Sequence, residues 1–267
     1  MIKSSYYFLA DLVNKRTVVF ELAKRDFQQQ YQGSYLGVLW AFLQPLLFIS
    51  VLYMVFTIGF RVGPSGDMPF ELYLISGMIA WLYFAENMSN STSVIQAHSF
   101  LVKKVDFRLS ILPIVKLLSS VIPHLFLISI AISFTWYQGY PPTLYTLQII
   151  YYLMAMQLLL LGFGWLTSST SVFVKDVSKV VAVITQFGFW LTPIFWNMSL
   201  IPERFHWIIK LNPAAYIVSG YRDSLVGQVG FWEKPDEALF FWITTFVFLL
   251  MGISVYRRLK PHFAEVI

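Results

Sequence analysis

The residues of this 267-residue sequence that are best suited to binding chemistry are aromatic rather than ionisable. Phe, Tyr and Trp make up 18% of the chain. The candidates for a substrate path are Phe187, Trp190, Phe195, Trp196, Trp207 and Tyr216. Such rings stack on the C–H faces of sugars, so they could line a path for a glycan with little charge. The alternative is an interfacial belt, because Trp and Tyr are enriched at the faces of a bilayer.

Motifs for catalysis or for holding a cofactor or metal do not occur in the chain. There is no GxxxxGK[ST] loop for ATP, no HExxH and no GxSxG, and the sequence contains no cysteine. The four histidines are scattered, and the acidic residues near the C-terminal third are not paired. We therefore expect no catalytic site, no cofactor and no metal in this chain. The net charge of +5 does not indicate nucleic-acid binding, because apolar runs interrupt the basic residues.

Ionisable residues are also rare inside the long apolar runs. Glu71 and Glu86 lie at the ends of one run, while Lys116 and His124 lie within another. A charge at the centre of a bilayer costs at least about 2.5 kcal/mol, so such residues are candidates for a function. The chain has no series of buried carboxylates of the kind a proton- or sodium-driven carrier needs. If the protein is a pump, we expect its energy source on another polypeptide.

The elements that must position these residues are apolar helices. The sequence is 57% hydrophobic and 12% charged, whereas soluble domains are about 25% charged. We predict an all-α membrane protein with six transmembrane helices, and a division into residues 1–37 and a membrane domain of residues 38–267. The predicted spans are residues 38–60, 70–88, 111–137, 144–174, 180–196 and 238–256.

The segment before the first span is predicted to be an amphipathic helix at the membrane surface. Phe20, Ala23, Phe27 and Tyr31 fall on one side of this helix, and Glu21, Lys24, Arg25 and Gln28 fall on the other. Gly33, Ser34 and Gly37 then allow the chain to turn into the membrane. The alternative is a surface helix of a soluble domain.

Two short helical pieces are predicted before the last span, at residues 205–211 and 214–226. They are too short to cross a membrane, which is typical of re-entrant helices, although an ordinary outer loop is the alternative. With both termini in the cytoplasm, thirteen Lys and Arg residues lie inside and five lie outside, with Arg222 among the five. This arrangement satisfies the positive-inside rule.

The hinge segment from Arg25 to Leu47 resembles the signature of ABC-2 type permeases that export polysaccharides. The matching positions are Arg25 and Asp26, Tyr31, Ser34, Leu36 and Gly37, Trp40 and Pro45. The resemblance continues in Pro193 to Trp196 and in Leu211 to Leu225. The chain looks like the membrane subunit of an O-antigen exporter of the bacterial inner membrane, with exporters of capsular polysaccharide and teichoic acid as near relatives. A drug exporter of the same superfamily is a further alternative.

The resemblance implies that two copies of the chain pair with two copies of a separate ATPase, which binds ATP and Mg. It implies an undecaprenyl-pyrophosphate-linked glycan as substrate and a channel lined by the aromatic residues named above. The ATPase would contact residues 14–32 and 90–104, and the candidate contacts are Glu21, Gln28, His98, Lys103 and Lys104. Arg16, Lys24 and Arg25 are candidates for the lipid pyrophosphate, because Arg pairs well with phosphate. The alternative for these three is the positive-inside bias together with ATPase contact.

Overall fold

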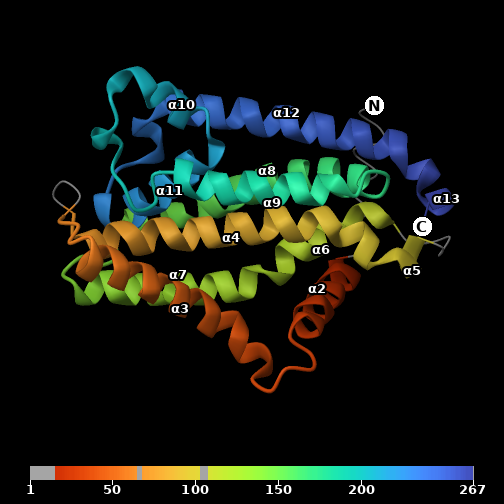
Figure 1. The fold of residues 1–267 in the computed structure, drawn as a ribbon, viewed down its shortest axis with the longest axis horizontal. Coiled ribbons are helices and arrows are strands. Elements are labelled where there is room, and N and C mark those ends of the chain that lie inside the picture. The colour runs from red at the N-terminus through yellow and green to blue at the C-terminus, as the bar shows by residue number, and fades with distance from the viewer. Residues whose placement is uncertain (1–15, 65–67, 103–107, 267) are drawn as a thin grey trace.

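The computed structural model describes residues 16–64, 68–102 and 108–266, and the side chains of 101 and 102 are not described. Within these residues the fold contains helices and no strand, which confirms the predicted all-α class (Figure 1). The α-helices are α2 (Arg16–Gln30), α3 (Trp40–Met54), α4 (Phe70–Ala97), α5 (Ser99–Val102), α6 (Leu112–Ser119), α7 (Val121–Tyr137), α8 (Gln148–Ser171), α9 (Asp176–Leu191), α10 (His206–Lys210), α11 (Pro213–Arg222), α12 (Pro235–Leu259) and α13 (Phe263–Val266).

Four helical segments of the described chain are long and apolar enough to cross a membrane. They are Gly37–Gly59, Leu109–Tyr137, Leu144–Ser171 and Pro235–Val266. They correspond to the runs predicted at residues 38–60, 111–137, 144–174 and 238–256. Two further helices, α4 with 28 residues and α9 with 16 residues, lie along the same long axis of the bundle (Figure 1).

The second and fifth predicted spans differ from the helices of the structure. Helix α4 continues to Ala97, through residues 89–97 that the sequence assigns to a polar inner segment. Its polar residues face α8, where the Thr92 Oγ1 donates to Thr167 Oγ1 at 2.9 Å and Ser171 Oγ donates to the Thr92 carbonyl at 2.7 Å. Helix α9 begins at Asp176 and ends at Leu191. Residues 192–196 of the predicted span 180–196 therefore lie outside the helix.

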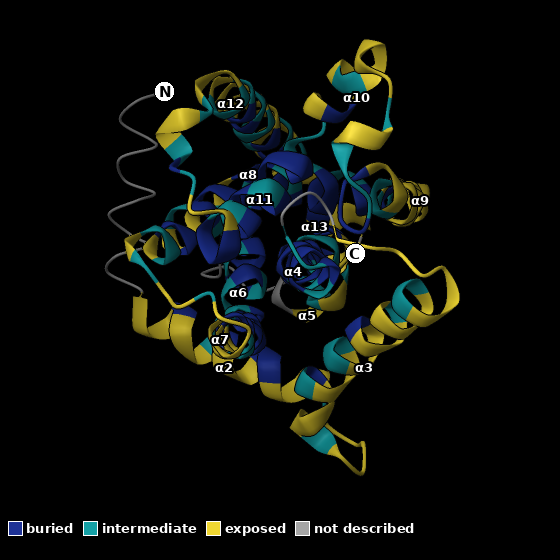
Figure 2. Ribbon diagram, turned by 90° about the vertical axis from the view of Figure 1, so that its left-hand side faces the viewer, coloured by how far each residue is buried: buried dark blue, intermediate teal, exposed yellow. Residues whose placement is uncertain are grey.

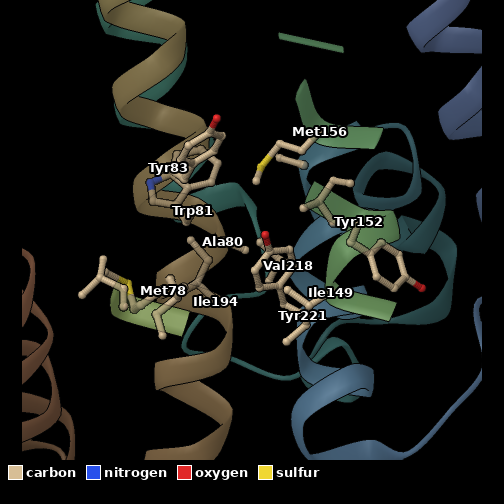
Figure 3. Close-up of a cluster of buried hydrophobic side chains, with 14 of the residues drawn as sticks. Met78, Ala80, Trp81, Tyr83, Ile149, Tyr152, Met156, Ile194, Val218 and Tyr221 are labelled. Carbon is tan, nitrogen blue, oxygen red and sulfur yellow. The ribbon is translucent and has the colours of Figure 1, made fainter. Parts of the chain in front are cut away.

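The core of the bundle lies between α4, α8 and α11 (Figure 3). Helix α4 contributes Met78 and Trp81, and α8 contributes Tyr152 and Met156, all of them buried. Gly220 of α11 allows a close approach to this core, because an added Cβ would lie 2.1 Å from the Tyr152 ring. Burial of such large side chains is worth about 1.5–3 kcal/mol for each residue, where it removes them from water.

Helix α2 packs on α6. Its buried residues are Val19, Ala23, Asp26 and Phe27, and Val19 and Ala23 pack against Ile111 and Val115. Phe20, on the predicted apolar side, is 64% exposed, whereas Ala23 and Phe27 of the same side are buried. The predicted polar side is confirmed, because Glu21, Lys24, Arg25 and Gln28 are all exposed. Figure 2 shows the exposed surface of α2 at the edge of the molecule.

The turn between α2 and α3 depends on two glycines in the left-handed region. Gly33 has φ +87° and Gly37 has φ +50°, values that residues with a Cβ rarely adopt. The chain therefore reverses here, and the turn between α2 and α3 forms the tip of a V that points away from the rest of the bundle (Figure 1). This confirms the predicted turn at Gly33 and Gly37.

Candidate functional site

One group of the predicted channel residues lies on the exposed side of α9 and on α10. Phe187, Trp190 and Trp207 are 59%, 57% and 59% exposed. Trp190 packs edge-on against Phe195 at 5.2 Å between centroids, and the Trp196 indole nitrogen donates to the Trp190 carbonyl at 3.0 Å. These rings form an aromatic surface at the end of α9, where it could meet a substrate, a lipid or another chain.

The other predicted channel residues are packed inside the single chain. Phe195 is buried and stacks on Phe56 at 4.9 Å. Tyr216 is buried beside Phe241 at 4.9 Å, and its hydroxyl lies 3.1 Å from the Tyr151 hydroxyl. Trp196 is intermediate in exposure. The structure thus brings Trp190, Phe195 and Trp196 together, while Tyr216 belongs to the core between α8, α11 and α12.

The break after α9 is held by two residues that the sequence analysis did not identify. The Tyr73 hydroxyl donates to the Trp196 carbonyl at 2.8 Å. The Arg222 Nη2 donates to the carbonyls of Pro193 at 3.0 Å and Ile194 at 3.4 Å. The Arg222 guanidinium also lies 3.4 Å over the centre of the Tyr73 ring. These contacts satisfy backbone groups that leave the helix, which is required where no water is available.

The count of Lys and Arg residues treated Arg222 as a charge in an outer segment, but the structure buries it. Its side chain is buried beneath α4, where Nη2 also donates to the Tyr73 carbonyl at 3.3 Å. No local signal in the sequence predicts this role, because Arg222 stands next to Asp223 within residues 214–226. Its neighbour Asp223 instead forms an ion pair with Lys234.

A buried ion pair joins α2 to α6. The Lys116 ammonium lies 2.9 Å from the Asp26 carboxylate, and the Ser119 hydroxyl donates to the same oxygen at 2.7 Å. The side chains of Lys116 and Asp26 are 14% and 9% exposed. A lysine close to the membrane edge can extend its ammonium to the headgroups, whereas the ammonium of Lys116 pairs with Asp26. Asp26 instead fixes the helix that the resemblance assigns to ATPase contact.

The structure describes some, but not all, of the residues predicted to bind the pyrophosphate or to contact the ATPase. Arg16, Lys24 and Arg25 are exposed on α2. His98 is the residue that follows α4, and its Nδ1 lies 2.9 Å from the Val94 carbonyl. Lys103 and Lys104 lie outside the described residues. The roles of all these residues stay predictions.

A groove that the sequence patterns did not predict lies beside the turn between α2 and α3. It has a volume of about 720 Å³ and is lined by the end of α2, the first half of α3 and the middle of α4. Its polar lining includes Gln30, Gln44, Glu86 and Asn90, and its aromatic lining includes Trp40. No group of three or more His, Asp or Glu residues in the described chain is placed to hold a metal ion.

Comparisons with known proteins agree with this architecture. The profile of the family described as ABC-2 type transporter matches residues 17–226. The chain is 29% identical over 247 residues to an O-antigen export system permease protein of Klebsiella pneumoniae, covering 92% of this chain and 93% of that protein. It is 24% identical to a protein of the same description from Myxococcus xanthus, covering 96% and 98%. It is 21% identical to the polysialic acid transport protein of Escherichia coli, covering 91% and 93%.

Proposed function

Because this chain belongs to the ABC-2 type transporter family, we propose that it is the membrane subunit of an exporter of lipid-linked polysaccharide, of the O-antigen type. The chain is a transport permease rather than an enzyme, and it works with an ABC ATPase. One observation carries the choice of substrate. The O-antigen permeases are 24–29% identical to this chain, whereas the permeases named for capsule or polysialic acid are 21–22% identical.

The proposed subunit crosses the inner membrane six times with both termini in the cytoplasm. Besides the four long apolar segments, α4 and α9 would complete the six crossings. Helix α9 alone is about 24 Å long, and the non-helical residues 192–196 extend it further. Helix α13 lies at one end of the bundle and α2 lies in the same half, while α10 lies at the other end (Figure 1). That separation is what a protein with both ends on one side of the membrane requires.

The transporter would contain two copies of this chain and two copies of the ATPase. Helix α9 supports a partner chain, because only Val181 of its residues is buried. Its outward side carries Val183, Ile184 and Phe187, all about half exposed. A second copy would cover part of this surface and lipid the rest. A path between the two copies would then run past Phe187 and Trp190.

The proposed mechanism is mechanical. The ATPase binds ATP and Mg, closes, and moves α2 through contacts with Glu21 and Gln28 and the segment after α4 through contacts with His98, Lys103 and Lys104. Movement of α2 reaches α6 through the Asp26–Lys116 pair and reaches α3 through the turn at Gly33 and Gly37. The exposed Arg16, Lys24 and Arg25 would attract the pyrophosphate of the undecaprenyl-linked glycan, because guanidinium groups pair well with phosphate oxygens.

Deletion of the gene tests the proposed substrate. We expect lipid-linked glycan to accumulate in the inner leaflet and surface polysaccharide to disappear, as measured by glycan blots of surface and membrane fractions. Normal surface O-antigen with loss of capsule or teichoic acid would instead support the alternative substrates. Normal surface glycan of every kind, with altered drug sensitivity, would support a drug exporter.

A further inference from the structure

We propose that the groove between α2, α3 and α4 is a binding site for a sugar residue of the exported glycan. In this site Glu86 and the surrounding amides would bind hydroxyl groups, and the Trp40 ring would stack on the face of the sugar. The inference rests on the proposed export of a glycan and adds the site at which the permease recognises the glycan itself. The groove adjoins the aromatic surface of α9, because its lining residue Phe48 lies 6.2 Å from Phe189 between ring centroids.

The polar groups of the groove suit hydroxyl groups that both donate and accept. Glu86 Oε1 accepts from Gln30 Nε2 and from Asn90 Nδ2, each at 3.4 Å. These hydrogen bonds are long and therefore weak, and no described group donates to the other carboxylate oxygen of Glu86. Gln32 and Gln44 add two more amides to the lining. Amides offer a donor and an acceptor, and a carboxylate accepts strongly, which matches the two roles of a sugar hydroxyl.

The apolar part of the lining is placed to complement a sugar ring. Trp40 and Phe48 come from α3, while Leu82 and Ala85 come from α4, opposite them. Trp40 is 39% exposed, so its ring is available to a ligand. The volume of about 720 Å³ is in the range of ligand sites, roughly 300–1,000 Å³. One or two sugar units would fit such a space.

The other parts of a lipid-linked glycan, and a divalent cation, fit the groove less well than a sugar residue. No Lys or Arg is among the lining residues, and Lys116 on the neighbouring α6 is already paired with Asp26. Glu86 would therefore repel a pyrophosphate. An acyl chain would leave the carboxylate and the amides without partners, at a cost of about 1–3 kcal/mol for each group. A divalent cation needs several oxygen ligands of which more than one is usually a carboxylate, and Glu86 is alone.

The first test compares Glu86→Gln with Glu71→Gln in the reconstituted complex of permease and ATPase. Glu71 is the matched control, because it lies at the other end of α4 and accepts from Gln138 Nε2, also at 3.4 Å, but outside the groove. ATPase stimulation is measured with lipid-linked glycan purified from the same cells and with bare undecaprenyl pyrophosphate. We expect Glu86→Gln to raise the glycan concentration for half-maximal stimulation about tenfold, with the bare lipid unaffected and Glu71→Gln like the wild type.

Two results of this test contradict the proposals in different ways. If the wild-type complex responds to the glycan and Glu86→Gln responds identically, the groove is not a sugar site and glycan export stands. If the wild-type complex does not respond to the glycan at all, the proposed function fails and the sugar site fails with it.

A second test detects the sugar directly. A photoreactive benzoylphenylalanine replaces Gln44, which lines the groove, or Leu47, which is 56% exposed on α3 outside it. After illumination of cells that export glycan, we expect a ladder of glycan adducts at position 44 and none at position 47. Equal adducts at both positions, or none at position 44 in a variant that still exports glycan, would overturn the proposal.

Discussion

At the scale of single residues, Arg222 shows how a charged side chain can serve the backbone. Its guanidinium binds the carbonyls of Pro193 and Ile194, where α9 has ended and the chain has no helical hydrogen bonds. The Tyr73 hydroxyl completes the arrangement by binding the Trp196 carbonyl. The orientation of Trp190 and Trp196 therefore depends on Tyr73 of α4 and Arg222 of α11, two buried residues that are not part of the exposed aromatic surface.

Replacing Arg222 with methionine should destabilise the permease. Methionine retains much of the volume but removes the Arg222 donor from both carbonyls and leaves that of Pro193 with only the Tyr73 hydroxyl at 3.4 Å, so we expect a loss of about 1–3 kcal/mol in the free energy of unfolding. Thermal unfolding of the purified protein in detergent measures this loss as a lower midpoint. Arg204→Met is the matched control, because Arg204 also lies over a ring, that of Phe205 at 4.8 Å, but is exposed. Equal midpoints for the two variants would contradict the assigned role.

The same residue shows a limit of the sequence reasoning. An arginine among outer-segment residues looks like a solvated charge, and its partners are carbonyls 28 and 29 positions earlier in the chain, which no local pattern reveals. The burial of Asp26 was not predictable for a related reason. The buried side of α2 follows from its packing on α6, and Asp26 is buried because Lys116 lies opposite it.

At the scale of elements, helices that face lipid are predictable from hydropathy alone. Four predicted runs agree with the long apolar helices. Helix α4 is longer than its apolar run because Thr92 and Gln96 find partners on α8, so polarity there reflects contact between helices rather than a loop. The groove was not predictable, since its residues come from three segments that are brought together by the turn at Gly33 and Gly37.

The connection of α2 to α6 should depend on the Asp26–Lys116 pair. Asp26→Ala leaves a largely buried ammonium without a partner, and Lys116→Ala leaves a buried carboxylate, at a cost on the order of 3 kcal/mol each. The double variant should cost clearly less than the sum of the two, as measured by thermal unfolding of all four proteins. Additive losses would mean that the pair contributes no coupling between the helices. If α2 transmits the ATPase stroke, each single variant should also lose glycan-stimulated ATPase activity.

The exposed aromatic surface of α9 should be needed for export and not for assembly. Trp190→Ala removes a ring that is 57% exposed, and we expect lower surface glycan with unchanged co-purification of the ATPase. Trp136→Ala is the control, because Trp136 is 63% exposed near the end of α7, on another side of the bundle (Figure 2). If both variants reduce export equally, or neither does, the rings serve as an interfacial belt.

At the scale of the whole molecule, the ends of the helices divide into two groups. The last turn of α12 carries Arg257 and Arg258, and α13 follows at that end of the bundle (Figure 1). The segment before α10, which contains Met198–Leu200, lies at the opposite end. The positive-inside rule then assigns α13 to the cytoplasm and the segment before α10 to the outside.

Variants with a single introduced cysteine test this orientation. The natural sequence contains no cysteine, so no native thiol has to be removed first. Ser199→Cys and Glu265→Cys both place a thiol at an exposed position, one at each end of the bundle. With a maleimide that does not cross the inner membrane, we expect labelling at position 199 in intact spheroplasts and labelling at position 265 only after permeabilisation. Labelling of position 265 in intact spheroplasts would place α13 outside the cell, where no cytoplasmic ATPase could act on α2 in the same half of the bundle.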